Sequence, residues 1–230
     1  MKKSKNLIFK LIAYFLFFYF LFFIFPKCIL IVKYKFTNPL TTKMMEYQLG
    51  VKAENIKIEW KKYNEISTNL KRAVVAAEDD NFINHHGVDW NGIKDAIIDN
   101  INKDRTRGGS TISQQLVKNL FLTPKKNYVR KLNEIILTFF MELVLSKDRI
   151  LEIYLNIVEW GDGLYGIQNA SIYYFKTSAN HLNTFQAAKL ASMLNNPKYF
   201  QKNFNSEYLH EKAFKILSRM DYSMIPYKKN

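Results

Sequence analysis

An unbroken apolar run near the N-terminus limits this chain more than any other feature of its sequence. Residues 11–25 read LIAYFLFFYFLFFIF, and a second apolar stretch, CILIV, follows at 28–32 after a Pro-Lys pair. A helix that spans a bilayer needs about 20 apolar residues. Leu7 to Phe25 supplies that length if the Lys10 side chain reaches back to the lipid headgroups. We therefore predict one transmembrane anchor over residues 11–32.

A cleaved signal peptide is the alternative for this segment. The apolar run is longer than a usual signal core and no Ala-x-Ala site follows it, which favours an uncleaved anchor. Lysines lie on both sides of the run: Lys2, Lys3, Lys5 and Lys10 before it, and Lys27, Lys33 and Lys35 after it. The positive-inside rule places residues 1–10 in the cytoplasm, although the lysines beyond the run weaken that bias. We expect a single-pass protein of the inner (cytoplasmic) membrane, with its domain in the periplasm or outside the cell.

The charge of the chain indicates what kind of partner it meets. The formal net charge is +14, and a basic surface favours nucleic acid, phosphorylated substrates or acidic membranes. An exported domain does not encounter nucleic acid, so lipid headgroups and lipid-linked phosphates remain. A basic protein without a specific anionic ligand is the plainer alternative. The single cysteine, Cys28, excludes an internal disulfide framework.

The spacing of apolar residues after the anchor is that of a mostly α protein. Residues 33–60 are interpreted as a membrane-proximal connector, with a short helix from about Pro39 to Gly50 and a strand-like alternation at Ile56–Trp60. Residues 61–230 contain no repeat or low-complexity linker, which indicates one continuous domain. Helical spacing recurs at 66–78, 90–101, 111–122, 129–145, 149–157, 165–175, 184–194 and 206–220.

The first polar cluster is EDDNFINHHG, which begins at Glu78. A carboxylate at the end of an apolar helix can project into a cleft and act as a general base on a sugar hydroxyl. A helix-terminal surface carboxylate is the alternative for a lone glutamate. Asp79 and His85 are expected to hold the following loop by hydrogen bonds to the backbone, and Phe82 to pin it to the core. Gly87 permits a positive φ or a close approach.

The second cluster is RGGSTISQQLVKN. Gly108 and Gly109 precede a helix whose N-cap is predicted to be Ser110 or Thr111. A glycine turn that leads into free helix N–H groups is a natural seat for a phosphate. One face of the helix carries Thr111, Gln114, Gln115 and Lys118. A ligand-binding face and a solvated helix face both fit this pattern.

The third cluster, RKLNE, places Arg130, Lys131 and Glu134 along one helix face. An exposed ion pair on a helix is the plain interpretation, and it contributes only a few tenths of a kcal/mol. The functional interpretation is a second carboxylate held between two cations that bind a diphosphate. Such cations stabilise the charge that develops on a leaving group.

The segment KDRILEIYLN, followed by VEWG, is mostly core-forming, so Glu152, Tyr154 and Asn156 are predicted to have structural roles. The sequence shows no His or Cys spacing typical of a metal site. It therefore requires no cofactor, although a divalent cation, Mg²⁺ or Mn²⁺, that bridges a carboxylate and phosphates stays open.

Taken together, these clusters resemble the peptidoglycan glycosyltransferases of glycosyltransferase family 51. EDDNFINHHG fits the first motif of that family, E-D-x-x-F-x-x-H-x-G, and RGGSTISQQLVKN matches the second almost residue for residue. RKLNE is similar to the third motif, RILEIYLN with VEWG to the fourth, and AAKLASMLNNPKYF is a looser version of the fifth. The resemblance covers Ile66 to Tyr199. The stretch VEWGDGLYGIQNASIYYF is most similar to the monofunctional biosynthetic branch.

The resemblance implies a lysozyme-like α fold with a smaller lobe near the membrane. It implies that the growing chain on its lipid diphosphate is transferred to the 4-hydroxyl of an incoming lipid II disaccharide, with inversion to a β-1,4 link. Glu78 becomes the general base and Glu134 the second catalytic carboxylate. The implied substrate-binding residues are Lys118, Arg130, Lys131, Ser110, Gln114, Gln115 and Asp79. The residues implied to shape the motifs are Phe82, His85, Gly87, Gly108 and Gly109.

The implied partners are lipid II, the growing glycan, membrane lipids and other cell-wall synthesis proteins, with no nucleic acid. Two other functions fit parts of the pattern. A membrane-anchored muramidase also uses two carboxylates, but it needs no seat for a diphosphate. A non-catalytic module that binds lipid diphosphates would keep its biological activity after Glu78→Gln.

Overall fold

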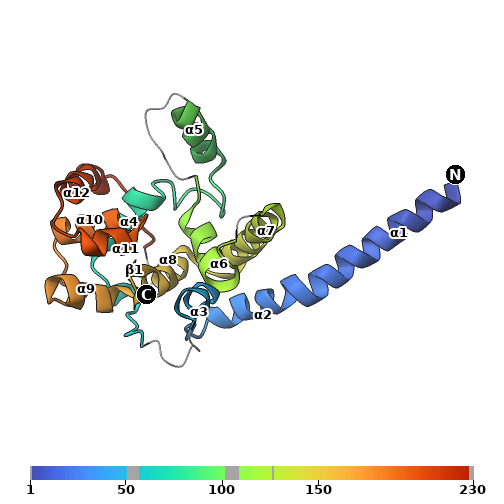
Figure 1. Cartoon of the computed structure of the whole chain (residues 1–230), viewed down its shortest axis with the longest axis horizontal. Helices are drawn as coiled ribbons and strands as arrows, with labels where there is room; N and C mark the ends of the chain where they lie inside the picture. Colours follow the sequence, from blue (N-terminus) through green and yellow to red (C-terminus); the bar gives the residue numbers. More distant parts are fainter. Residues whose placement is uncertain (1, 51–56, 102–108, 126, 228–230) are drawn as a thin grey trace.

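The structure, a computed structural model, describes residues 2–50, 57–101, 109–125 and 127–227. A helical domain carries one long helix that projects far beyond it (Figure 1). The long helix consists of α1 (Lys2–Tyr19), a π-helical turn η1 (Phe20–Ile24) and α2 (Phe25–Tyr34). The π turn ends at Ile24, two residues before Pro26. A proline removes an N–H and crowds the preceding turn, so a wider turn at this place lets the helix continue.

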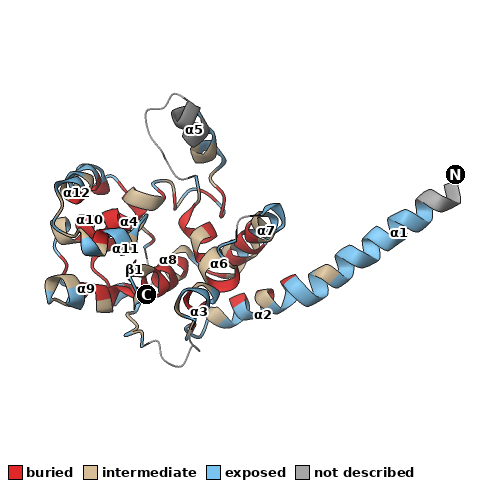
Figure 2. Cartoon of the chain, viewed as in Figure 1, coloured by how far each residue is buried: buried red, intermediate tan, exposed pale blue. Residues whose placement is uncertain are grey.

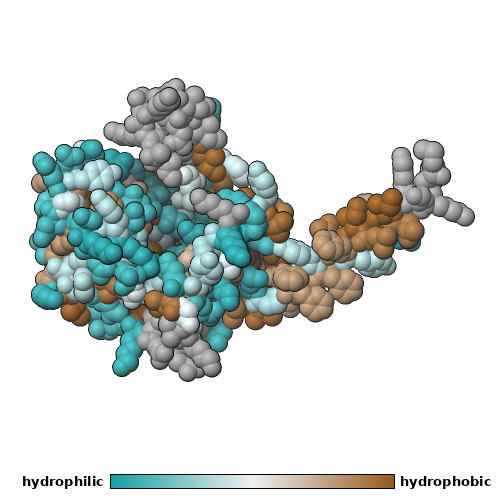
Figure 3. Space-filling view, in the orientation of Figure 1, coloured by the Kyte–Doolittle hydropathy of each residue, from teal (hydrophilic) through white to brown (hydrophobic). Residues whose placement is uncertain are grey.

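This helix is the predicted anchor. Within the described residues, Asn6–Tyr34 is the one helix long and apolar enough to cross a membrane, with a mean hydropathy of 2.5. Its apolar side chains are largely exposed along α1 (Figure 2), and they form the apolar arm seen in the space-filling view (Figure 3). Exposing such a row of apolar side chains to water is unfavourable, whereas contact with the lipid hydrocarbon is favourable.

The C-terminal half of the anchor helix packs against the domain. Ile24, Cys28 and Ile31 are buried, and α2 packs against α7. The Asn133 amide donates a hydrogen bond to the Tyr19 hydroxyl at 2.6 Å. The position of the domain relative to the anchor is therefore fixed by a packed junction, in addition to the covalent link.

The predicted connector contains the expected short helix, α3 (Lys43–Leu49). Thr42 caps it by accepting a hydrogen bond from Met45 N at 3.1 Å, and Gly50 ends it with a φ of 57°. The strand predicted at Ile56–Trp60 is wrong for residues 57–60, which have no strand structure, and Ile56 lies outside the described residues.

The connector does not form the predicted strand because side chains of another helix already form hydrogen bonds with its polar groups. The Trp60 indole donates to Glu152 Oε1 at 3.1 Å, and Tyr63 N donates to Glu152 Oε2 at 2.9 Å. Asn156 accepts from Lys61 N and donates to Lys61 O, both at 2.8 Å. A backbone held in this way needs no partner strand, and the structural roles predicted for Glu152 and Asn156 are confirmed.

The domain is formed by helices, as predicted. They are α4 (Thr68–Glu78), α5 (Trp90–Ile101), α6 (Ile112–Phe121), α7 (Tyr128–Val144), α8 (Lys147–Ile157), α9 (Ile167–Phe175), α10 (Thr184–Met193), α11 (Pro197–Lys202) and α12 (Glu207–Met220). Each segment with helical spacing coincides with a helix to within about two residues. The sequence pattern did not predict α11. It also missed the antiparallel hairpin of β1 (Glu159–Gly161) and β2 (Leu164–Tyr165).

The core of the domain determines where the functional clusters lie. All residues of α8 from Ile150 to Ile157 are buried, and α6 packs on this helix as well as on α7. Elsewhere in the core, α10 packs on α4 and α12. Because α4 and α6 are both anchored in packed helices, the ends of these two helices are rigid platforms for polar side chains.

Candidate active site

Glu78 is the last residue of α4, and it faces the first turn of the α6 helix. Its Oε2 accepts a hydrogen bond from Gln115 Nε2 at 2.8 Å. The other end of the Gln115 amide, Oε1, accepts from the Tyr154 hydroxyl at 3.0 Å. Tyr154 is fully buried on α8. The hydroxyl therefore fixes the orientation of the amide, so that its NH₂ group points at the carboxylate.

The electrostatic environment of Glu78 suits a base. Burial raises the pKa of its carboxyl above the ordinary value of 4.5, and the neighbouring Asp79 carboxylate acts in the same direction. The Gln115 hydrogen bond and the charges of Lys212 and Lys118 partly oppose this rise in the pKa. A carboxylate whose pKa moves toward neutral pH accepts a proton more readily than a free one.

The loop after Glu78 is held by a small hydrogen-bond network. Both oxygens of Asp79 lie 3.0 Å from His85 Nε2, and Asp79 Oδ2 also accepts from Ile112 N at 2.9 Å. His85 Nδ1 accepts from Gly87 N at 3.0 Å, so the proton of the neutral imidazole is on Nε2, where it donates to Asp79. His85 binds the backbone of the loop, as expected, but the backbone partner of Asp79 is Ile112 on α6. Asp79 instead contacts the loop through its direct bond to His85, which was not predicted.

Two further residues of this loop have the expected surroundings. Phe82 is fully buried. Gly87 has a φ of +94°, and a Cβ at this position would lie 2.7 Å from Thr138 Cγ2. The backbone conformation and the lack of space both require glycine. The first motif is thus a folded loop that carries Glu78 at its start.

The N-terminus of α6 is capped by Thr111, one of the two residues predicted for this role. Thr111 Oγ1 accepts from Gln114 N at 3.2 Å, and Gln114 Oε1 accepts from Thr111 N at 3.0 Å. This capping box means that the buried Gln114 stabilises the helix start. Thr111 Oγ1 also donates to Gly87 O at 2.6 Å, which joins the two motifs. Gly109 and Ser110 lie beside the cap, and Gly108 lies outside the described residues.

The three cations predicted to hold a diphosphate line one groove. Glu134 is buried, and it accepts from Arg130 Nη1 at 2.7 Å and from Lys131 Nζ. Burial lowers the pKa of Lys118, while the charge of Glu134 acts against this shift. The groove has a volume of about 360 Å³ and is lined by Met44, Ser110, Gln114, Gln115, Lys118, Pro124, Arg130, Lys131 and Glu134.

The groove continues to Glu78. Ser110 lines it, and Ser110 also lines a smaller cavity of about 30 Å³ that contains Glu78 and Asp79. Gln115 contacts Glu78 and lines the larger groove. The described residues of the predicted site are therefore brought together, with the carboxylate at one end and the cations at the other. The roles given to individual residues remain predictions.

Two residues near Glu78 were not among the predicted functional residues. Tyr154 was assigned to the core, and it is buried there, but its hydroxyl also orients Gln115. Lys212 on α12 acts on Glu78 by its charge, and its ammonium donates to Asn195 Oδ1 at 2.9 Å. No local pattern identifies either residue, because each depends on helices that are distant in the sequence.

The structure thus combines a carboxylate, Glu78, and a groove lined by cations with a helical domain and an apolar anchor. Residues 44–221 match the model of the Transglycosylase family, and the chain belongs to this family. Its mostly α, lysozyme-like fold agrees with the prediction.

Two relatives support this assignment, and both are named biosynthetic peptidoglycan transglycosylase. The chain is 46% identical to the one from Dechloromonas aromatica over 197 residues, which is 83% of this chain and 85% of the relative. It is also 46% identical to the one from Aromatoleum aromaticum over 203 residues, 86% of this chain and 88% of the relative.

Proposed function

We propose that this protein polymerises peptidoglycan glycan strands from lipid II. Membership of the Transglycosylase family and the names of the relatives support this reaction. The observation that carries the assignment to this site is the contact of Gln115 with Glu78, on a groove that also contains Lys118, Arg130 and Lys131. The substrates are lipid II and the growing glycan on its lipid diphosphate.

In the proposed reaction, Glu78 is the general base. It removes the proton of the acceptor 4-hydroxyl as that oxygen attacks the terminal sugar carbon of the donor. The bond from that carbon to the diphosphate breaks, its electron pair leaves with the diphosphate, and the configuration inverts to a β-1,4 link. A sugar hydroxyl is a poor nucleophile, and positioned proton transfer contributes about 10²–10⁴-fold to such a step.

The cations of the groove act on the leaving group. Lys118, Arg130 and Lys131 would neutralise the charge that develops on the diphosphate. The leaving group is then stabilised without the proton that a general acid would donate. Glu134 holds two of these cations by hydrogen bonds, so they are oriented before the substrate arrives. Pre-organised charges of this kind need no rearrangement in the transition state.

The site also bears on the proposed divalent cation. Within the described residues, no group of three or more His, Cys, Asp or Glu side chains is arranged to hold a metal ion. Glu134 is the carboxylate of the groove, and two cations already engage it. We therefore propose that Mg²⁺ or Mn²⁺, where present, is bound mainly by the diphosphate oxygens.

The anchor explains how the enzyme meets a substrate that stays in the bilayer. We propose that residues 1–10 lie in the cytoplasm and that the domain lies on the outer face of the inner membrane, where other cell-wall synthesis proteins are its further partners. Confinement to the same membrane raises the effective concentration of lipid II at the site.

Incubation of the purified full-length protein with lipid II, followed by sizing of the glycan, tests the reaction. We expect long β-1,4-linked strands and consumption of lipid II. A parallel incubation with mature, lipid-free peptidoglycan tests the muramidase alternative. Release of soluble fragments from that material, with lipid II left intact, would refute the proposed reaction.

A further inference from the structure

The outward side of α7 is apolar along the whole helix, and the proposed reaction does not use it. The exposed residues of this helix are between 40% and 96% accessible, and all of them are aliphatic or aromatic: Tyr128, Val129, Leu132, Ile136, Phe139 and Leu143. Apart from Val129 they recur every three or four residues, so they form one stripe about 22 Å long. We call this stripe the α7 face.

The α7 face differs from the outer face of a helix that meets water. A surface helix normally places charged and polar residues on its outer side. In the same domain, α12 does so, because its exposed residues include Glu207, Glu211, Lys215 and Arg219. α7 is described throughout, and none of its exposed residues carries a charge. A continuous apolar stripe of this length indicates an interaction surface.

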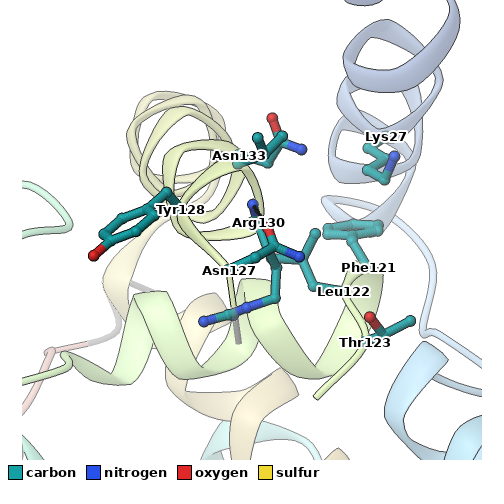
Figure 4. Close-up of a pocket in the computed structure, with 9 residues that line it drawn as sticks. Lys27, Phe121, Leu122, Thr123, Asn127, Tyr128, Arg130 and Asn133 are labelled. Atoms are coloured by element: carbon teal, nitrogen blue, oxygen red, sulfur yellow. Dashed lines mark hydrogen bonds between the residues drawn. The ribbon is translucent and has the colours of Figure 1, made fainter. Parts of the chain in front are cut away.

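The α7 face lies beside the membrane anchor. α7 is on the side of the domain from which the anchor projects (Figure 1), and it packs on α2. The Asn133 amide donates to the Tyr19 hydroxyl at 2.6 Å, and Tyr19 lies within the apolar segment that ends at Phe25. Contact with Tyr19 therefore brings α7 to the level of this segment. Figure 4 shows Asn133 on the side of α7 toward the anchor and Tyr128 on the other side, so the anchor leaves the α7 face uncovered.

We propose that the α7 face is inserted in the outer leaflet of the membrane, where it contacts the acyl chains of the lipids. A transmembrane helix of another chain is the alternative occupant. Helices that pack together in a membrane place small residues such as glycine, alanine or serine at their contact, which lets the backbones approach. The α7 face consists of large side chains only. The neighbouring anchor exposes side chains of the same kind, such as Phe15, Phe18 and Phe22, so the composition favours lipid.

The insertion of α7 has a consequence for the reaction groove, and this consequence rests on the proposed function. Arg130 and Glu134 line the groove. At 3.6 residues per turn they lie on the side of α7 opposite the α7 face. A helix with one side in the hydrocarbon holds its other side at the surface of the leaflet. The groove is then at the level where the diphosphate of lipid II lies.

A depth measurement on the full-length protein tests the insertion without using lipid II. The protein is placed in nanodiscs of phosphatidylglycerol and phosphatidylethanolamine. A spin label is attached to Leu132→Cys or Ile136→Cys, each with Cys28→Ala, because Cys28 is the single native cysteine. Phe214→Cys, at an exposed position of α12, is the matched control, and Phe15→Cys in the anchor gives the value for hydrocarbon. Collisions of the label with oxygen, which concentrates in hydrocarbon, are compared with collisions with a water-soluble nickel chelate.

We expect the two reagents to rank in opposite order on the two helices. Oxygen should collide more often than nickel at Leu132 and Ile136, as at Phe15, and nickel more often than oxygen at Phe214. An excess of nickel collisions at either position of α7 would overturn the proposal, because the α7 face would then lie in water. Low accessibility to both reagents would also overturn it, since another protein chain would then cover the face.

Photolabelling of the wild-type protein gives a second test that needs no substitution. A phospholipid with a diazirine at the end of an acyl chain is activated in the same nanodiscs, and mass spectrometry of the peptides locates the adducts. We expect adducts on the anchor and on residues 128–143, and none on α12, although α12 also exposes Tyr208 and Phe214. Adducts confined to the anchor would overturn the proposal. Lipid II is absent from both experiments, so neither result depends on whether the protein polymerises it.

Discussion

Replacing Gln115 by leucine should move the pH dependence of the reaction in a known direction. The Gln115 amide donates to Glu78 Oε2 at 2.8 Å, and this hydrogen bond stabilises the charged form of the carboxylate. It therefore lowers the pKa of Glu78, against the larger effect of burial. Without the bond the pKa rises further. A general base must be deprotonated, so the acid limb of the activity profile should shift to higher pH.

The size of the shift follows from the contact. A hydrogen bond to a charged group contributes about 1.5–3 kcal/mol, and one pKa unit corresponds to about 1.36 kcal/mol. Glu78 is partly exposed, so we take the lower end of this range and expect a shift of about one pH unit. On the acid limb the rate should then fall about tenfold relative to the wild-type protein. Well above both pKa values the two profiles should differ only in plateau height.

The assay is the initial rate of lipid II polymerisation as a function of pH. Tyr154→Phe should give a smaller shift in the same direction, because it removes the hydroxyl that orients the Gln115 amide. Asn119→Leu, a polar residue on the next turn of α6, is the matched control. An acid limb that stays at the wild-type pH in Gln115→Leu, with only the plateau lowered, would refute the role of this bond in tuning Glu78.

Three further perturbations test other contacts. Glu78→Gln should raise the thermal midpoint at pH 7 by a few degrees, because burial raises the pKa of the folded-state carboxyl and ionised Glu78 therefore destabilises the fold. The gain in thermal midpoint should vanish below about pH 4.5, where Glu78 is protonated in both the folded and the unfolded state. A gain that persists there would contradict this reasoning. Gly87→Ala should destabilise the protein by about 2 kcal/mol in denaturant unfolding, and adding Thr138→Ser, which removes the crowding methyl, should recover part of the loss; no recovery would exclude the steric cause. Lys118→Ala should lower kcat/KM for lipid II by tenfold or more, while the exposed Lys125→Ala should not; equal effects would argue against a specific contact with the diphosphate.

The helices could be predicted from the sequence because their signals are local. Apolar spacing located α6 and α7. That Lys118 and Arg130 share a groove was implied only by the family resemblance, and the fold shows it. The Gly87 conformation also followed from a local rule, since a glycine that ends a polar loop commonly has a positive φ. The helix positions and the Gly87 conformation needed no knowledge of how the helices pack.

The strand prediction failed for a tertiary reason. The alternation near Trp60 is present in the sequence, but Glu152 and Asn156 bind this segment from α8, and no local pattern reports that contact. The function of the Tyr154 hydroxyl was missed for the same reason, because a tyrosine among periodic apolar residues has the pattern of core packing. The packing of the anchor on α7 likewise has no local signal, and only the fold shows it.

The central claim is that Glu78 takes the proton of the acceptor hydroxyl, and single-turnover polymerisation of lipid II by the Glu78→Gln protein tests it most directly. The account predicts that this variant binds lipid II with near-normal affinity and loses at least about a hundredfold in the rate of bond formation. Asp80→Asn, which removes a neighbouring exposed carboxylate, should keep most of the activity. A Glu78→Gln rate within a few-fold of the wild-type rate would contradict the account.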